Sequence, residues 1–264
     1  NFKKNMKGII LAGGNGTRLH PLTISVSKQI LPVFDKPMIY YPLSTLISMG
    51  VSDILIITNK QNLPVFKTLL EDGKKFGINI SYELQNAPNG IAEALIIGED
   101  FLNNENVVLI LGDNIFISNN INSDSISDFN SGAKLFCVDV KKPERYGVVK
   151  YKDNGTIDSI VEKPENFISS KAVTGLYIYD KNASMLAKSL KPSNRGELEI
   201  TDLNNLYISQ GSMRIDDLGI NSLWLDAGTF NSLKQSAEQI SSQQSRSGLL
   251  LGSPEIESFK QGFI

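Results

Sequence analysis

The chain has 264 residues and a net charge of -2, with 41% hydrophobic and 20% charged residues. It is long enough for one large α/β domain or two small ones, and its composition is that of an ordinary globular protein. The near-neutral charge argues against a nucleic-acid-binding protein, and no apolar run reaches the roughly 18 residues that a membrane span needs.

Few residues are available for disulfide or metal chemistry. Cys137 is the one cysteine and His20 the one histidine, so we expect no intrachain disulfide and no structural zinc site. Cys137 lies in the apolar run 133–140 and is predicted to be buried rather than nucleophilic. Residues 1–5 are mostly polar and lack an apolar core, and Met6 has the character of an initiator, so we expect a short extension without a signal peptide and a cytoplasmic enzyme.

The first half alternates strand-like and helix-like segments. Short apolar runs predict buried parallel strands at 8–12, 54–58 and 107–111. Helical spacing predicts helices at 38–49, 63–70 and 91–98. Such alternation implies right-handed crossovers, so the predicted fold class is α/β, with a doubly wound, mostly parallel, Rossmann-like sheet and helices on both faces.

After Gly132 the pattern becomes mixed and more antiparallel. The runs 147–151 and 156–161 flank Asp153-Asn154-Gly155, a strong hairpin signal. Further strands are predicted at 134–140, 173–179 and 222–225, and helices at 182–189, 199–210 and from Thr229 to about Ser242. The polar run Ser241–Ser247 is expected to be a linker or exposed turn, and the segment 119–130 a mobile surface loop.

A glycine-rich loop at 13–18 follows the first strand. Its three glycines allow the backbone N–H groups to surround an anion, and Arg18 adds a forked cationic donor. The loop lacks the Gly-Lys-Ser/Thr of a P-loop, and Leu19 replaces the third glycine of a dinucleotide fingerprint. Alone it fits a plain strand–turn connection equally well, but the nearby Lys28 favours a phosphate-binding loop.

Two carboxylates follow apolar strands in distant segments. Asp113 comes after the run 107–111, and Asp226 comes after 223–225. The carboxyl ends of strands are where open α/β sheets bind ligands. If the two converge, they suit Mg²⁺, which takes one or two carboxylates together with waters and substrate phosphates.

Several ordered motifs, taken together, resemble those of the sugar-1-phosphate nucleotidylyltransferases. They are Leu11-Ala12-Gly13-Gly14, Gly16-Thr17-Arg18, Ser27-Lys28-Gln29, Leu31-Pro32 and the segments 35–43, 111–114, 143–149, 162–164 and 195–202. The similarity runs from Met6 to Ile264 and is strongest to the thymidylyl-transferring branch. It implies transfer of a thymidylyl group from dTTP to α-D-glucose 1-phosphate, with Mg²⁺ as cofactor and a dimer-of-dimers homo-oligomer.

The resemblance also implies roles for individual residues. The residues that it implies for nucleotide binding are Leu11, Ala12, Gly13, Gly14, Gly16, Thr17, Arg18, Gln85, Gly90 and Asp113. Among them, Gln85 and Gly90 would contact the base. Sugar-phosphate binding falls to Tyr146, Gly147, Glu162, Lys163, Val173, Arg195 and Trp224. The catalytic residues are Arg18, Lys28, Lys163 and Arg195, and the Mg²⁺ ligands are Asp113 and Asp226.

The same resemblance implies a single domain over 1–264. In it, 6–132 would mainly bind nucleotide, 133–240 would mainly bind sugar phosphate, and 241–264 would form a C-terminal segment.

Three alternatives remain open at this point. A related nucleotidylyltransferase could use UTP or another sugar 1-phosphate. A metal-dependent glycosyltransferase usually carries an Asp-x-Asp pair, but Ile115 occupies the position of the second Asp. A non-catalytic nucleotide-binding regulator is disfavoured because Asp113, Asp226 and Lys163 are all present.

Overall fold

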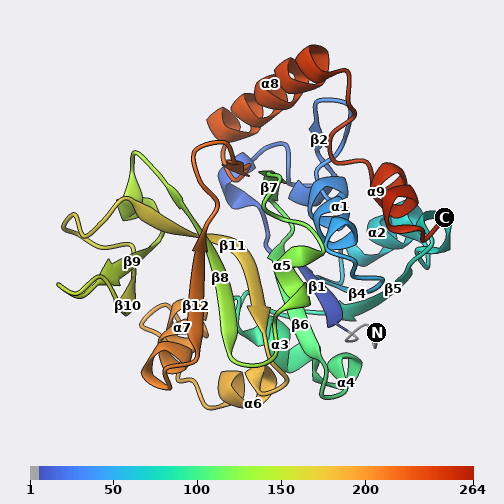
Figure 1. Ribbon diagram of the computed structural model, residues 1–264. Coiled ribbons are helices and arrows are strands. Elements are labelled where there is room, and N and C mark those ends of the chain that lie inside the picture. Colours follow the sequence, from blue (N-terminus) through green and yellow to red (C-terminus); the bar gives the residue numbers. More distant parts are fainter. Residues whose placement is uncertain (1–5) are drawn as a thin grey trace.

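The computed structural model describes residues 6–264, so the expectation for residues 1–5 lies outside the described residues (Figure 1). A large sheet crosses the molecule. Its strands are β1 (Met6–Ala12), β4 (Asp53–Thr58), β5 (Asn79–Leu84), β6 (Asn106–Leu111), β8 (Ala133–Asp139), β9 (Gly147–Tyr151), β10 (Ile157–Glu162), β11 (Lys171–Tyr179) and β12 (Met213–Asp217). The order is β10-β9-β11-β6-β1-β4-β5, with β8 joined to both β11 and β12.

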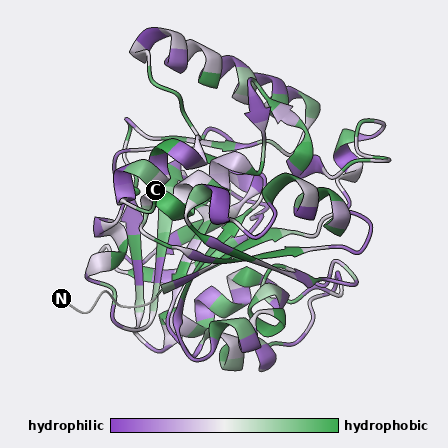
Figure 2. Cartoon of the chain, turned by 90° about the vertical axis from the view of Figure 1, so that its right-hand side faces the viewer, coloured by the Kyte–Doolittle hydropathy of each residue, from purple (hydrophilic) through white to green (hydrophobic). Residues whose placement is uncertain are grey.

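The parallel part of the sheet is covered on both faces. β1 pairs in parallel with β4 and β6, and β4 pairs in parallel with β5. Successive residues of β1 enter opposite cores, Ile9 on one face and Ile10 on the other, as the two-residue period of a strand requires. The covering helices are α1 (Tyr40–Ser48), α2 (Leu63–Leu70), α3 (Glu93–Ile97), α4 (Glu99–Leu102), α6 (Ala183–Lys188) and α7 (Ile200–Ser209). Apolar strands lie between these helical layers in Figure 2, and the predicted α/β fold class is confirmed.

The second half adds antiparallel strands to the same sheet. Leu176 of β11 pairs with Ile110 of β6, so residues 171–174 extend past the carboxyl end of β6. The hairpin of β9 and β10 joins this extension where Ala172 pairs with Val148. It therefore stands beyond the ends of the parallel strands and provides a wall for any ligand that binds there (Figure 1).

Smaller elements lie around this sheet. They are the pair β7 (Asn114–Ile117) and β13 (Leu223–Asp226), the pair β2 (Pro32–Val33) and β3 (Lys36–Pro37), and the helices α5 (Asp124–Ser127), α8 (Phe230–Ser247) and α9 (Pro254–Gln261). The sequence predicted β13 but not β7, its antiparallel partner. Within residues 6–264 no helix has both the length and the apolar character to cross a bilayer.

The predicted linker at Ser241–Ser247 is wrong, because α8 continues through it. Thr229 caps the helix as predicted, and its hydroxyl accepts from the Ser232 N–H. Ile240 is fully buried on the inner face, and the side chain of Gln244 donates to Asp35 and accepts from the Leu251 N–H. These tertiary contacts hold a polar sequence in helical form until Gly248, whose left-handed conformation ends it.

The segment 119–130 is anchored rather than a plain surface loop. It contains α5, and its apolar residues Ile121 and Phe129 are both buried in the core. Cys137 is buried as predicted, and burial raises the pKa of its thiol to about 12, which makes it a poor nucleophile.

Candidate active site

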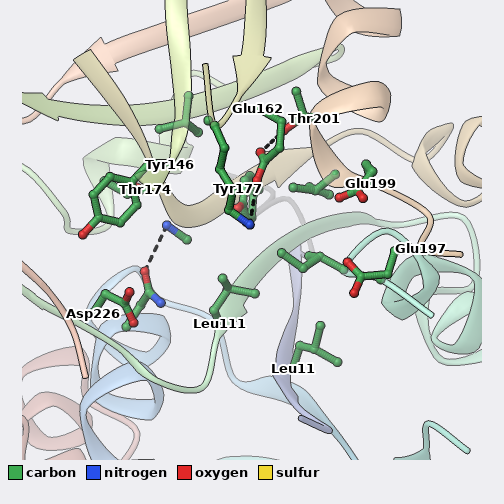
Figure 3. Close-up of a pocket in the computed structure, with 18 of the residues that line it drawn as sticks. Leu11, Leu111, Tyr146, Glu162, Thr174, Tyr177, Glu197, Glu199, Thr201 and Asp226 are labelled. Atoms are coloured by element: carbon green, nitrogen blue, oxygen red, sulfur yellow. Dashed lines mark hydrogen bonds and ion pairs between the residues drawn. The ribbon is translucent and has the colours of Figure 1, made fainter. Parts of the chain in front are cut away.

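A cleft of about 450 Å³ opens at the carboxyl ends of β1 and β6, where Leu11 and Leu111 contribute to its floor (Figure 3). The β9–β10 hairpin and the start of α7 form its walls. In Figure 3, Asp226 lies at one side of the cleft and Glu197 and Glu199 lie at the other. This is the position at which open α/β sheets bind ligands, and the extension of β11 past β6 deepens it.

Most of the site residues predicted from the sequence meet in this one cleft. They are Leu11, Gly14, Arg18, Gln85, Gly90, Asp113, Tyr146, Gly147, Glu162, Lys163, Val173, Arg195, Trp224 and Asp226. The others, Ala12, Gly13, Gly16, Thr17 and Lys28, are not among the lining residues. Of these, Lys28 reaches the site indirectly, through an ion pair with Asp113.

The glycine loop makes a tight turn at the edge of the cleft, where Gly14 is one of the lining residues. Gly16 has a φ of 62°, which glycine adopts without strain, and its carbonyl accepts from the Thr23 hydroxyl at 2.6 Å. The following turn brings Arg18 to the cleft, where its guanidinium passes close to Gly228. A Cβ on Gly228 would stand 2.9 Å from Nη2 of Arg18 and 2.8 Å from Oδ1 of Asp226. The absence of a side chain at 228 therefore leaves room for this cation and this carboxylate.

Asp113 and Asp226 approach each other through the pairing of β7 with β13, which sets Asp226 opposite Asn114. Burial opposes ionisation of Asp113, but the charge of Lys28 and hydrogen bonds from Lys28 and Asn114 hold its pKa below the usual range. Burial, and then the Asp113 charge, raise the pKa of Asp226. Two enclosed carboxylates that repel each other are suitable oxygen ligands for a divalent cation.

Two carboxylates are too few ligands for a metal site that is built from protein side chains alone. In the part of the chain that the structure describes, no group of three or more His, Cys, Asp or Glu side chains is arranged to hold a metal ion. A pair of carboxylates fits Mg²⁺, because this ion keeps several waters and takes further oxygens from substrate phosphates.

Asn114 holds the Asp113 carboxylate in place. It is 3% exposed, and its Nδ2 donates to Oδ1 of Asp113 at 3.0 Å. Its own Oδ1 accepts from the Gly175 N–H at 3.1 Å and from the Trp224 indole at 2.6 Å. One buried amide thus ties β7 to β11 and β13 and fixes the orientation of a candidate metal ligand.

Alanine at Gly175 should disturb this network. The added Cβ would lie 2.5 Å from Oδ1 of Asn114 and 2.8 Å from Cδ1 of Leu111, closer than real Cβ contacts allow. We expect Gly175→Ala to lower the free energy of unfolding by about 1–3 kcal/mol, measured by urea denaturation. Gly14→Ala is the matched reference, since a Cβ there meets nothing within 4 Å. Equal stability of the two variants would contradict a tight packing role for Gly175.

The hairpin end of the cleft carries an acid and a base side by side. Oε2 of Glu162 accepts from the Thr201 hydroxyl at 2.8 Å, and its Oε1 lies 3.5 Å from Nζ of Lys163. Lys163 has a φ of 43°, uncommon for a residue with a Cβ, and its N–H donates to the Tyr146 carbonyl at 3.0 Å. The rings of Tyr146 and Trp224 pack with centroids 5.0 Å apart. An anion carrying hydroxyl groups would find both a cation and an acceptor here.

Arg195 lies at the same end of the cleft, but its guanidinium forms ion pairs with two glutamate side chains. Its Nη2 is 2.9 Å from both carboxylate oxygens of Glu199 and 3.5 Å from Glu197. To bind a phosphate, the guanidinium has to exchange these carboxylates for the ligand. Its predicted role in holding the sugar phosphate stays a prediction.

Sequence reasoning did not single out several residues of the cleft. Thr201, Glu197 and Glu199 lie inside the motif 195–202. The two acids that follow Arg195 in this motif are the sequence feature that could have indicated a role in the cleft. Asn114 follows Asp113 directly in its motif. Glu93, which contacts Gln85 from outside the cleft, had no signal beyond its place at a predicted helix start.

Comparison with known proteins gives consistent matches. The model of the family described as nucleotidyl transferase matches residues 7–243. Glucose-1-phosphate thymidylyltransferases from Neisseria meningitidis and Mycolicibacterium smegmatis are 50% and 48% identical, each over 98% of this chain and 91% and 90% of their own lengths. A crystal structure of a Bacillus anthracis protein assigned to the same enzyme, in complex with sucrose, matches with a TM-score of 0.82 and 42% identity, covering 89% of this chain and 94% of that one.

A further structural match is more distant. The structure of a UDP-glucose pyrophosphorylase complexed with UDP-glucose has a TM-score of 0.75 and 25% identity, and the alignment covers 90% of this chain and 99% of that chain.

Proposed function

Because the chain belongs to the nucleotidyl transferase family, we propose that it transfers a thymidylyl group from dTTP to α-D-glucose 1-phosphate, giving dTDP-glucose and pyrophosphate. The observation that carries this proposal is a single cleft with a glycine loop and paired carboxylates at one side and Glu162 and Lys163 at the other. This arrangement occurs in a chain about as long as its thymidylyltransferase relatives and half identical to them.

The reaction needs no protein nucleophile. An oxygen of the sugar phosphate attacks the α-phosphorus of the nucleotide in line, and the bond from that phosphorus to the bridging oxygen breaks as pyrophosphate leaves. Both reactants are anions, so the main task of the protein is to bring like charges together in the right geometry, which can supply roughly 7–11 kcal/mol of the barrier. Lys163 and Arg195 hold the attacking phosphate, while Arg18 and the N–H groups of the glycine loop bind the leaving pyrophosphate.

Asp113 and Asp226 would hold Mg²⁺ at the nucleotide side, with Lys28 orienting Asp113. The bound ion would neutralise phosphate oxygens and make the α-phosphorus more electrophilic. The divalent-metal dependence is part of the proposal, supported by the two repelling carboxylates. We also include in the proposal the dimer-of-dimers assembly, whose subunit contacts would bury exposed apolar residues in the segment from α8 to α9, such as Phe230, Leu249 and Phe259.

A general base is unnecessary, because the attacking phosphate is already ionised. His20 is exposed and does not line the cleft. We therefore expect His20→Ala to keep kcat and KM within about twofold of the wild type, as measured by pyrophosphate release. The reason is that substitutions at exposed positions outside a binding site or a packed core usually have small effects. A folded His20→Ala enzyme that is slow would overturn the base-free scheme.

The function is tested by incubating the protein with Mg²⁺, one nucleoside triphosphate and one sugar 1-phosphate at a time, and measuring pyrophosphate. We expect release with dTTP and glucose 1-phosphate, and dTDP-glucose as the co-product. UTP is the second candidate donor, because the fold is also that of a UDP-glucose pyrophosphorylase. If no pair releases pyrophosphate, the proposal fails.

A further inference from the structure

The side chain of Gln85 has one fixed orientation at the cleft. It is 5% exposed and follows the last residue of β5. Its Nε2 donates to Oε2 of Glu93 at 2.8 Å and to the Gly90 carbonyl at 3.2 Å. An ionised carboxylate and a carbonyl only accept hydrogen bonds, so both demand the NH₂ group of the amide on this side.

The oxygen of Gln85 consequently points the other way. A Cβ on Gly13 would stand only 2.5 Å from this Oε1, so the oxygen faces the glycine loop along the nucleotide side of the cleft. The structure gives it no hydrogen-bond donor among residues 6–264, although Gln85 lines the cleft. Gln85 therefore presents an acceptor to a bound ligand and keeps its donors for the protein.

Glu93 is itself held in position. Its second carboxylate oxygen accepts from Nδ2 of Asn89 at 2.8 Å, and it lies at the first residue of α3. The loop before it is fastened to Leu198, whose N–H donates to the Asn89 carbonyl at 2.6 Å. Gly90, with a φ of 107°, packs so closely there that a Cβ would lie 2.3 Å from the Leu198 carbonyl oxygen. Glu93 does not line the cleft, so it acts on a ligand only through Gln85.

Resting on the proposed function, we propose that Glu93 is the positioning residue that makes the base site select pyrimidines with a protonated N3. Thymine and uracil carry an N3–H that can donate to Oε1 of Gln85. Cytosine presents a lone pair at N3, which would face the Gln85 oxygen and repel it. A site with a fixed acceptor discriminates strongly, because the wrong base leaves a buried polar group unpaired.

A purely structural role for Glu93 predicts a different result. If Glu93 only fastened the loop, its loss would weaken every nucleotide to the same extent. If it sets the orientation of the Gln85 amide, its loss changes the ratio of affinities for dTTP and dCTP. The ratio thus separates positioning from general damage.

Two substitutions test the orientation. Glu93→Lys replaces an acceptor by a charged donor, whose hydrogen bond to the Gln85 oxygen should outweigh the 3.2 Å bond from Nε2 to the Gly90 carbonyl. The Gln85 amide should therefore rotate and present its NH₂ group to the base. Glu93→Gln is nearly isosteric and lets either orientation form. Glu99→Gln is the matched control, because it makes the same change at an exposed acid that pairs with Lys188 outside the cleft.

The measurement is equilibrium binding of dTTP and of dCTP by isothermal titration calorimetry in the presence of Mg²⁺. We expect the wild type and Glu99→Gln to prefer dTTP by about 100-fold or more, Glu93→Gln to lose about tenfold of that ratio, and Glu93→Lys to lose at least as much. A Glu93→Lys protein that keeps the wild-type ratio overturns the proposal, as does a wild type without preference. If Glu93→Lys does not fold, an unchanged ratio in Glu93→Gln overturns it instead.

Pyrophosphate release by the wild type reports separately on the proposed function. A protein that binds dTTP selectively but forms no pyrophosphate would refute the transfer reaction. The binding ratio of the Glu93 variants would still decide the role of Glu93.

Discussion

Replacing Lys163 by alanine should lower kcat/KM for pyrophosphate formation by about a thousandfold, the size of effect seen when one preorganised charge-stabilising donor is removed. The side chain of Lys163 is half exposed, and its Nζ lies 3.5 Å from Oε1 of Glu162. Its backbone has a φ of 43°, and a hydrogen bond to the Tyr146 carbonyl holds it at the end of the hairpin. A lysine kept in a costly conformation at a cleft is the kind of outlier that marks function.

The stability of the Lys163→Ala protein should change by less than about 0.5 kcal/mol, because the side chain is not packed in the core. Lys150→Ala is the matched control, since Lys150 lies in the same hairpin and forms a 2.8 Å surface ion pair with Asp158. It should leave turnover unchanged. Lys163→Gly should lose the same activity but gain about 1 kcal/mol of stability in urea denaturation, because glycine relieves the backbone strain. A near-normal rate for folded Lys163→Ala would remove Lys163 from the mechanism.

The parts of the fold that depend on local sequence could be predicted. β1, β4 and β6 are buried on both faces, so they appear in the sequence as continuous apolar runs. The turn residues Asp153-Asn154-Gly155 indicate the β9–β10 hairpin. The fold class follows from the alternation of these strands with helices. Most of the cleft could be predicted for a different reason, since its residues belong to motifs that resemble one family.

The parts that depend on distant contacts could not be predicted. β7 is only four residues long, and it exists because it pairs with β13, more than a hundred residues later in the chain. The same pairing brings Asp226 to Asp113, so spacing in the sequence could not establish that they converge. The last turns of α8 depend on Ile240 and Gln244 contacting other segments. The orientation of the Gln85 amide likewise depends on Glu93, which carries no motif.

Replacing Asp226 by asparagine should have opposite effects on turnover and on stability. Burial and the charge of Asp113 raise the pKa of Asp226, so keeping this side chain ionised at neutral pH costs folding free energy in the absence of metal. Asparagine removes the charge, and we expect the metal-free variant to be about 1 kcal/mol more stable than the wild type, a gain typical of relieving strain at an active site. Turnover should fall by about a thousandfold or more, because a Mg²⁺ ligand is lost.

The dependence of stability on pH and on Mg²⁺ shows whether Asp226→Asn acts by removing an unfavourable charge or by a change in packing. The folded pKa of Asp226 lies above the ordinary value of 3.8, so its destabilising charge is fully present at neutral pH and disappears as the pH falls to that value. The stability advantage of Asp226→Asn in urea denaturation should therefore shrink on acidification. Mg²⁺ should stabilise the wild type by mass action and leave the variant almost unchanged, with Asp158→Asn, at a surface ion pair, behaving like the wild type. A variant that still gains stability from Mg²⁺ would show that Asp226 is not a metal ligand, because the differential binding that produces the gain would survive without its carboxylate.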